Sequence, residues 1–183
     1  MADRSLVVVN YRSAALCREA VASARAASEE PLEVVVVDNS CDESEAAALE
    51  TVGADRLVIA RSNLGYAGGA NAGIAASAGA TVIVSNPDVV FGAGSVDELA
   101  GSLGGGVALA GPRFSWDRSG EWLLPPAEIM TFRGELSRRL AARLASRAVR
   151  RSRRRFHARV GFWRETAPRR VGAVSGAVIA IDR

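Results

Sequence analysis

The chain has 183 residues and a mass of 19.1 kDa, which is enough for one α/β domain and too short for two ordinary ones. Its hydrophobic content of 49% and charged content of 23% are typical of a globular protein, not of a disordered or collagen-like one. All 23 basic residues are arginine, and this lack of lysine excludes P-loop NTPases and Schiff-base enzymes, because both need a lysine side chain.

The charge is distributed unevenly along the chain. Residues 133–170 contain fourteen arginines and two glutamates and so carry a net charge of +12. The other residues contain nine arginines and eighteen acids and carry a net charge of −9. An acidic globular body therefore carries one strongly cationic segment, which alone accounts for the pI near 9.5.

Short apolar runs rich in β-branched residues recur along the chain and predict buried strands. Helical segments alternate with these runs, which is the rhythm of a parallel sheet covered by helices on both faces. The predicted strands cover residues 6–9, 32–37, 56–60, 81–85 and 107–110, and apolar strand character returns at 171–181.

Helix start signals lie between the apolar runs. Ser13 is placed to cap an alanine-rich helix, and the acids within 42–45 favour the start of a second helix through the macrodipole. The glycine-rich residues 65–73 open a helix that runs to about Ala78. The tetrapeptide 95–98, Ser-Val-Asp-Glu, predicts a capping box.

The strand–helix rhythm stops after Pro112. An irregular stretch follows, then an arginine-rich arm of helical character over residues 132–160. We therefore expect one α/β domain over residues 1–183 with a helical insert, in three parts that span 1–112, 113–170 and 171–183.

The cysteine content and the lengths of the apolar runs indicate where in the cell the protein is located. Cys17 and Cys41 are too few and too isolated for a disulfide framework or a zinc site. The N-terminus is not that of a signal peptide, and no apolar run approaches the roughly 18 residues of a membrane span. We expect a cytoplasmic protein that is at most peripheral at the inner face of the plasma membrane.

Four polar clusters follow predicted strands, and the carboxyl ends of parallel strands are where ligands bind in such sheets. Any one cluster is also what an ordinary turn contains, but four on successive strands indicate a polar binding crevice. A carboxylate after the second strand suits a nucleobase or ribose, and glycines offer backbone N–H groups at a helix start. The clusters are Asn10-Tyr11, Asp38-Asn39-Ser40, Asn63 with Gly65 and Asn71 of the glycine run, and Asn86-Pro87-Asp88.

Two cofactor classes can be compared at these clusters. The turn after the first strand, residues 10–13, contains no glycine, which argues against a Rossmann dinucleotide site. Asp88 stands on a rigid turn after a buried strand. A hard cation such as Mg²⁺ binds through one or two carboxylates together with substrate phosphates, so Asp88 can anchor a metal–diphosphate complex.

Four motifs carry a resemblance to a known family. They are Val-Val-Asn-Tyr at 8–11, Val-Asp-Asn-Ser at 37–40, Asn-Leu-Gly-Tyr-Ala-Gly-Gly-Ala-Asn-Ala-Gly at 63–73 and Ser-Asn-Pro-Asp at 85–88. In this order they resemble the family 2 glycosyltransferases of GT-A fold, specifically the rhamnosyltransferase-like bacterial branch. Gly111-Pro112-Arg113 and Val174-Ser175-Gly176-Ala177 also match, so the resemblance covers about residues 5–182.

The resemblance implies a GT-A fold, a mostly parallel sheet that binds a nucleotide-diphosphate-sugar donor within residues 1–112. It implies that Asp38 holds the base or ribose and that Asp88 binds a divalent metal, Mg²⁺ or Mn²⁺. The other donor-side residues would be Asn10, Tyr11, Asn39, Ser40, Asn63, Gly65, Asn71 and Asn86, and the acceptor side would begin at Ser175, Gly176 and Ala177.

The implied reaction is the inverting transfer of a sugar, rhamnose in this branch, to a glycan or polyprenyl-linked acceptor in cell wall polysaccharide synthesis. A metal on the diphosphate assists the leaving group, and a carboxylate takes the proton of the acceptor hydroxyl. In the family this base lies beyond the Val-Ser-Gly-Ala segment, so we expect a truncated chain that lacks it. None of Asp117, Glu121 and Asp182 is assigned the role.

The arginine-rich arm admits three interpretations. The first is a solvated helical face. The second is a membrane-surface helix, because Leu136, Leu140 and Leu144 lie on one arc, although no clear apolar face continues from Arg147 onward. The third is nucleic-acid binding, which no recognition motif supports. The alternative function is therefore a catalytically incomplete nucleotide-fold module whose arm binds an anionic membrane or another polyanion.

Two tryptophans lie in the irregular stretch before the arm. Trp116 and Trp122 suit stacking on an acceptor sugar, and they equally suit covering an edge of the core. The sequence leaves both roles open.

Overall fold

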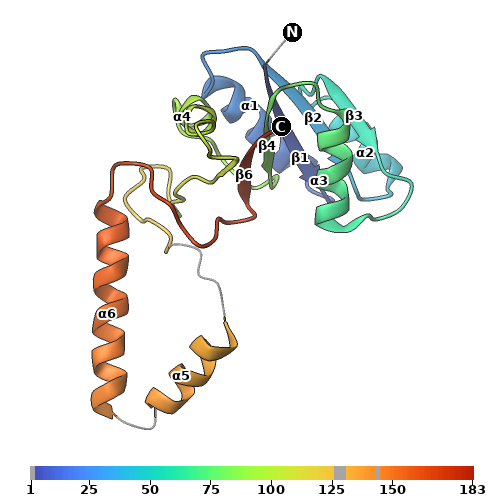
Figure 1. Ribbon diagram of the computed structural model, residues 1–183. Coiled ribbons are helices and arrows are strands. Elements are labelled where there is room, and N and C mark those ends of the chain that lie inside the picture. The colour runs from blue at the N-terminus through green and yellow to red at the C-terminus, as the bar shows by residue number, and fades with distance from the viewer. Residues whose placement is uncertain (1–2, 126–130, 143–144) are drawn as a thin grey trace. The chain divides into compact units, whose positions relative to one another are not determined.

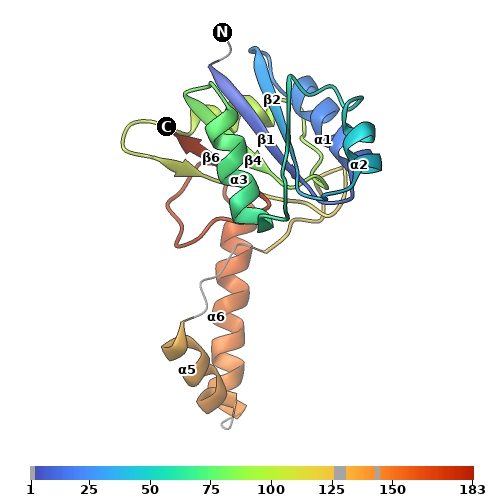
Figure 2. The ribbon, with the colours of Figure 1, turned by 90° about the vertical axis from the view of Figure 1, so that its right-hand side faces the viewer.

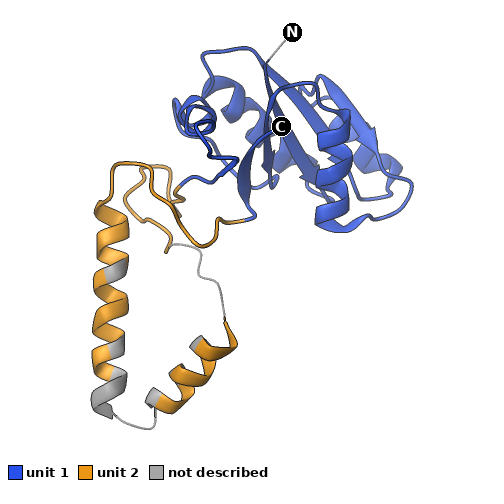
Figure 3. Ribbon diagram, viewed as in Figure 1, with its two compact units in different colours: residues 1–112, 176–183 blue, residues 113–175 orange. Residues whose placement is uncertain are grey.

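The structure of the chain, a computed structural model, describes residues 3–125, 131–142 and 145–183. It divides into two compact units (Figure 3). Unit 1 comprises residues 1–112 and 176–183, and unit 2 comprises residues 113–175. The chain thus leaves unit 1 after Pro112 and returns to it at Gly176.

Unit 1 is built on one six-stranded sheet (Figure 1). Its strands are Arg4–Asn10 (β1), Leu32–Asp38 (β2), Arg56–Ile59 (β3), Thr81–Ser85 (β4), Leu109–Ala110 (β5) and Val178–Asp182 (β6). Their order in the sheet is β3-β2-β1-β4-β6-β5. Parallel pairing joins β1 to β2 and β4, and β2 to β3, whereas β6 lies antiparallel between β4 and β5.

The predicted α/β class is confirmed, and each predicted apolar run overlaps a strand of this sheet, the last run only from Val178 onward. Two details differ from the sequence prediction. The run at 107–110 contributes only two strand residues, and β6 runs antiparallel to its neighbours. An apolar run indicates burial on both faces but not the direction of the strand, so the sequence pattern could not distinguish the two orientations.

Four helices cover the sheet of unit 1, namely α1 (Ala14–Ala26), α2 (Glu43–Leu49), α3 (Gly65–Ala76) and α4 (Ser95–Gly101). α1 and α2 contact each other on one face of the sheet. α3 lies on the opposite face, where it contacts β1, β2, β3 and β4 (Figures 1 and 2). The expected covering of both faces is therefore present.

A valine-rich core joins α3 to the sheet. Burying a valine side chain contributes roughly 1.5–3 kcal/mol relative to leaving it exposed. Gly73 permits the close approach of the helix, because a Cβ atom there would lie 2.2 Å from Cγ1 of Val7. The members of this core, each at most 9% exposed, are Val7, Val9, Val35, Val37, Ala70, Val82 and Val84.

The helix starts differ from the sequence prediction in two places. Ser13 precedes α1 but makes no capping hydrogen bond through its side chain, and Glu45 Oε1 instead accepts from the first N–H of that helix at 2.7 Å. Gly94, with φ +71°, occupies the N-cap position of α4, so Ser95 is already helical and forms no capping box. Asp42 caps α2 by accepting from two backbone N–H groups.

Unit 2 contains a short hairpin and two mutually contacting helices, α5 (Phe132–Ala142) and α6 (Ala145–Arg164), so the described part of the predicted arm is helical. Arg113 Nη1 donates to the backbone oxygen of Glu165 at 2.7 Å, and Trp163 Nε1 donates to that of Leu124 at 3.4 Å. These bonds tie the hairpin to the end of α6. Among the helices that the structure describes, none combines the length and hydropathy of a bilayer span.

Candidate functional site

The carboxyl ends of β1 and β2 bring two predicted site residues together. Asn10 and Asp38 are the last residues of their strands and stand opposite each other in the parallel register. Both side chains are completely buried, which is unusual for an amide and a carboxylate in a strand core. Such burial requires hydrogen-bond partners, and these partners define the site.

Asn10 is held by a network that the sequence analysis did not anticipate. Its Oδ1 accepts from the backbone N of Ser13 at 3.0 Å and from the Ser13 hydroxyl at 2.8 Å. Its Nδ2 donates to Glu45 Oε1 at 2.9 Å. Glu45 therefore links the ends of β1, α1 and α2. The only sequence signal for Glu45 was its place in the first turn of a helix, which predicts a dipole interaction and not this contact.

Asp38 has one engaged and one unengaged carboxylate oxygen. Oδ1 accepts from the backbone N of Ser40 at 2.9 Å and from Asn10 Nδ2 at 3.4 Å. Oδ2 is also buried, and it has no hydrogen-bond partner among the described residues. A buried carboxylate oxygen without a donor is costly. The structure thus leaves one acceptor at the end of β2 that a donor group of a ligand would satisfy.

Asn39 and Asn63 organise the loop that begins α3. Asn39 Oδ1 accepts from Leu64 N at 3.0 Å, and its Nδ2 donates to the backbone oxygen of Gly65 at 2.9 Å. Asn63 Oδ1 accepts from Gly65 N at 2.8 Å. Gly65 has φ +69°, a conformation that glycine adopts without strain. The two asparagines therefore hold the start of α3 beside the end of β2, at the same edge as Asp38.

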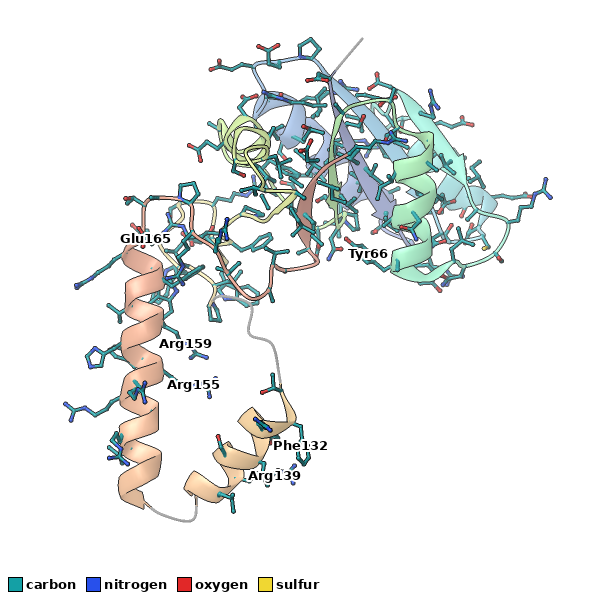
Figure 4. The ribbon with its side chains drawn as sticks, in the orientation of Figure 1. Tyr66, Phe132, Arg139, Arg155, Arg159 and Glu165 are labelled. Atoms are coloured by element: carbon teal, nitrogen blue, oxygen red, sulfur yellow. The ribbon has the colours of Figure 1, made fainter. Side chains whose placement is uncertain are left out.

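Two backbone contacts bring the predicted acceptor segment to this edge. The Tyr66 hydroxyl, at the start of α3 (Figure 4), donates to the backbone oxygen of Gly176 at 2.6 Å. Asn86 N donates to the backbone oxygen of Ala177 at 2.8 Å. Burial raises the pKa of Tyr66, so its hydroxyl remains protonated and able to donate at neutral pH. Tyr66 is a site residue that the sequence analysis quoted in a motif but did not single out.

The remaining predicted residues differ in their surroundings. Tyr11 is 54% exposed, with the Arg12 guanidinium 5.8 Å from its ring centroid. Ser40 is buried beside Asp38, and its hydroxyl accepts from Asp42 N. Asn71 is exposed about 9 Å along α3 from Gly65, given a rise of about 1.5 Å per residue, and the structure does not bring it into the network. Ser175 belongs to unit 2.

Asp88 is the predicted metal ligand. It is exposed just after the carboxyl end of β4, and it forms no hydrogen bond or ion pair with the described residues. The described residues contain no group of three acidic, histidine or cysteine side chains that could enclose a metal. A single open carboxylate fits a cation that is carried mainly by substrate phosphates, and it does not fit a permanently bound metal.

Three other reactive side chains, those of Cys17, Asp182 and Asp117, are poor candidates for a catalytic group. Burial, together with the nearby acids Glu45 and Asp38, raises the pKa of the Cys17 thiol to about 12, so the thiol stays neutral. Asp182 pairs with Thr81 at the opposite edge of the sheet. The Asp117 carboxylate is occupied by hydrogen bonds within its own turn. No catalytic base is therefore assigned within the described residues.

Comparisons with known proteins place the fold and the family. The sequence profile described as "Glycosyl transferase family 2" matches residues 5–173. A mannosyltransferase from Pyrobaculum calidifontis, solved with GDP-Man and Mn²⁺, has a TM-score of 0.54 and 20% identity over 66% of this chain and 37% of its own. Glucosyl-3-phosphoglycerate synthase from Mycobacterium tuberculosis, solved with UDP, has a TM-score of 0.53 and 19% identity over 99% of this chain and 57% of its own.

These matches show a shared GT-A fold, and the present chain spans only part of the length of either structure. A search of curated proteins finds no match. Because the profile covers most of the sequence, the chain belongs to glycosyl transferase family 2.

Proposed function

We propose that this family 2 glycosyltransferase chain binds a nucleotide-diphosphate-sugar at the carboxyl edge of its parallel strands and transfers the sugar to an acceptor hydroxyl. The observation that carries the proposal is the buried Asp38: its Oδ2 has no donor in the part of the chain that the structure describes, while Asn10 and Ser40 hold its Oδ1 in place. An N–H group of a base or a hydroxyl of a ribose would supply that donor.

The loop at the start of α3 supports the donor site. A Cβ atom at Gly65 would meet nothing within 4 Å among the described residues, so a ligand can approach the backbone closely there. Asn63 holds the Gly65 N–H, and the next N–H groups of α3 have no acceptor within the helix and lie at the positive end of its dipole. A diphosphate is the part of the donor that these groups would attract.

Asp88 would hold the divalent cation, Mg²⁺ or Mn²⁺, together with the donor phosphates. When bound, the cation would offset the charge that develops on the departing nucleoside diphosphate. The structural neighbour from Pyrobaculum calidifontis was solved with GDP-Man and Mn²⁺, which supports a cation at this type of site. Asp88 is exposed and has no partner among the described residues, which leaves both of its oxygens available to a cation.

The acceptor would enter beside Gly176 and Ala177, which Tyr66 and Asn86 hold near the donor edge. We propose a glycan or a polyprenyl-linked sugar as acceptor and rhamnose as the transferred sugar, on the resemblance of the motifs to the rhamnosyltransferase-like branch. Transfer by direct displacement would invert the anomeric carbon: the acceptor oxygen forms the new bond as the bond to the diphosphate breaks. The proton of the acceptor hydroxyl then needs a base.

The proposal is tested by calorimetric titration of dTDP- and UDP-sugars with and without Mn²⁺. We expect Mn²⁺ to tighten binding to the unaltered protein, and Asp88→Ala to weaken binding in Mn²⁺ by at least about 10-fold, since it removes the only protein ligand proposed for the cation. The matched control is Asp182→Ala, which removes an exposed carboxylate from the opposite edge of the sheet. Equal affinities with and without Mn²⁺, or equal losses in the two variants, would contradict the proposed role of Asp88.

A further inference from the structure

The hairpin of unit 2 presents two tryptophans on one face. Ser115 and Leu123 form an antiparallel bridge, and Trp116 N donates to the backbone oxygen of Trp122 at 2.9 Å. Trp116 and Trp122 are therefore opposite each other in the ladder, so their side chains project to the same side. They are 80% and 70% exposed, which decides against the alternative that they cover an edge of the core.

The turn that joins the two tryptophans is closed by hydrogen bonds to Asp117. Its Oδ1 accepts from Trp122 N at 2.8 Å, and its Oδ2 accepts from Glu121 N at 3.2 Å and from the Ser119 hydroxyl. The exposed pair thus belongs to an ordered turn. Large aromatic side chains kept exposed on an ordered element indicate a surface that another molecule covers.

The helices of unit 2 also expose large apolar side chains. On α5, the side chains at the i, i+4 and i+8 positions are Phe132, Leu136 and Leu140, and they are 82%, 46% and 55% exposed. These positions follow one another along one side of a helix. Figure 4 shows Phe132 on the side of α5 that is turned away from α6. α5 therefore carries an apolar stripe that its partner helix does not cover.

α6 carries a second apolar stripe, which the sequence analysis did not recognise. At about 100° per residue, Val149, Phe156 and Val160 fall within an arc of about 40°. Val149 and Phe156 are each 59% exposed. The prediction that no apolar face continues after Arg147 was therefore wrong. The apolar residues of α6 recur at intervals of seven and four residues, a spacing that differs from that of the leucines in α5.

Arginines lie beside these stripes. Exposed arginines on α5 and α6 include Arg133, Arg150, Arg153, Arg154 and Arg164. Residues 133–170 carry a net charge of +12 in sequence. A helix with a dense cationic face and an exposed apolar stripe is characteristic of peptides that lie in the interface of an anionic bilayer. Tryptophan is likewise enriched at the level of lipid headgroups, because its ring is apolar and its N–H is polar.

We propose that unit 2 binds the surface of an anionic lipid bilayer through the tryptophan pair, the stripes of α5 and α6, and the adjoining arginines. A nucleic acid would account for the arginines alone. It would leave unexplained seven large apolar side chains exposed between 46% and 82% in one unit, namely Trp116, Trp122, Phe132, Leu136, Leu140, Val149 and Phe156. The proposal does not depend on the donor site, since all its residues lie in unit 2.

Intrinsic fluorescence provides a direct test, because all three tryptophans of the chain, Trp116, Trp122 and Trp163, lie in unit 2. We expect vesicles of phosphatidylcholine and phosphatidylglycerol to shift the emission to the blue, and brominated lipid to quench it. Vesicles of phosphatidylcholine alone should give neither effect at matched lipid concentration. A duplex oligonucleotide should leave the emission maximum unchanged. Binding of the oligonucleotide without any response to anionic vesicles would overturn the proposal.

Variants separate the ionic and apolar contributions in vesicle sedimentation. Replacing Arg150, Arg153 and Arg154 by glutamine should weaken binding roughly 100-fold, given about 1 kcal/mol for each arginine near an anionic surface. The charge-matched control replaces exposed arginines of unit 1 by glutamine and should change binding by less than about 3-fold. The control residues are Arg12, Arg18 and Arg61.

The apolar contribution is tested by Trp116→Ser with Trp122→Ser, which should weaken binding at 0.5 M salt by about 10-fold, since salt screens charge but not apolar insertion. Its control, Ile59→Ser with Val90→Ser, removes exposed apolar side chains from unit 1 and should have no effect. If the tryptophan double variant binds anionic vesicles as well as its control does, the proposed insertion is wrong. These outcomes are independent of Asp88→Ala, so failure here and failure of the donor site are distinguishable.

Discussion

Unit 1 buries two polar side chains of its candidate site at the ends of strands, whereas unit 2 exposes arginines and large apolar side chains on helices and a turn. In unit 1, Asn10 and Asp38 are fully buried and fixed by neighbouring backbone and side-chain groups. In unit 2, arginines and large apolar side chains are exposed together. Rigid, buried polar groups suit selection of a small ligand, and an exposed amphipathic surface suits an extended partner.

The largest expected effect comes from comparing a glycine-to-alanine substitution in unit 1 with one in unit 2. Gly73→Ala places a Cβ atom 2.2 Å from Val7 and 2.9 Å from Val37, and we expect a loss of about 3 kcal/mol in the free energy of unfolding. Gly161→Ala in α6 meets no atom within 4 Å and should strengthen that helix by up to about 1 kcal/mol. Urea denaturation measures both. If both variants lowered the free energy of unfolding by similar amounts, the inferred difference in packing around the two glycines would be wrong.

The next effect concerns the buried network of unit 1. Asn10→Ala leaves the Ser13 N–H and Glu45 without their partner, so we expect a loss of about 2 kcal/mol in unfolding free energy. Asn71→Ala, on the exposed side of α3, should change it by less than about 0.5 kcal/mol. Thermal melts of the two variants compare them directly. Equal melting temperatures would show that the Asn10 network adds nothing to stability.

A smaller effect tests whether Asp38 serves the ligand or the fold. In Asp38→Asn, the amide oxygen keeps the bond from Ser40 N, so the NH₂ group replaces the unpartnered Oδ2. We expect nucleotide binding to weaken about 10-fold, because a donor then faces a donor, while the melting temperature stays equal or rises. Unchanged affinity together with a higher melting temperature would show that Oδ2 does not meet the nucleotide.

The smallest effect lies in the turn of unit 2. A hydrogen bond from the Ser119 hydroxyl, with further bonds from backbone N–H groups, lowers the pKa of Asp117 to about 2. A lowered folded-state pKa adds stability above the unfolded value near 4, and that stability is lost as the pH falls from about 4 to about 2. The indole N–H signals of Trp116 and Trp122 should shift in this window, and Asp117→Asn should reproduce the shift at pH 7. Signals that stay constant down to pH 2 would contradict this role.

The sequence predicted the strands of unit 1 well, because buried β-branched runs have few alternatives. The polar residues at the strand ends were also located, since parallel strands place their carboxyl ends at one edge. What each side chain does there depends on atoms distant in sequence. The sequence placed Asn39 and Asn63 on the donor side but did not predict that their amides fasten the start of α3.

Other features of the structure could not be predicted from local sequence patterns. Glu45 reaches Asn10 only because β1 and β2 are in register with α2 beside them. The tetrapeptide at 95–98 matches a capping box, but Gly94 adopts a left-handed conformation and takes the N-cap position. The direction of β6 depends on how the chain returns from unit 2, which no local pattern of apolar residues encodes.

The antiparallel pairing of β5 with β6 determines which segment of the chain can be exchanged without altering the sheet. Ala110 pairs with Ala180, so the strands on either side of unit 2 are adjacent in the sheet. Everything between Arg113 and Ser175 is a loop closed by that pairing. Because each doubling of a flexible loop costs only about 0.6 kcal/mol, segments of very different length and surface can be exchanged there without altering the sheet. The position of unit 2 thus allows its surface to vary separately from the strand ends of unit 1 that carry Asn10 and Asp38.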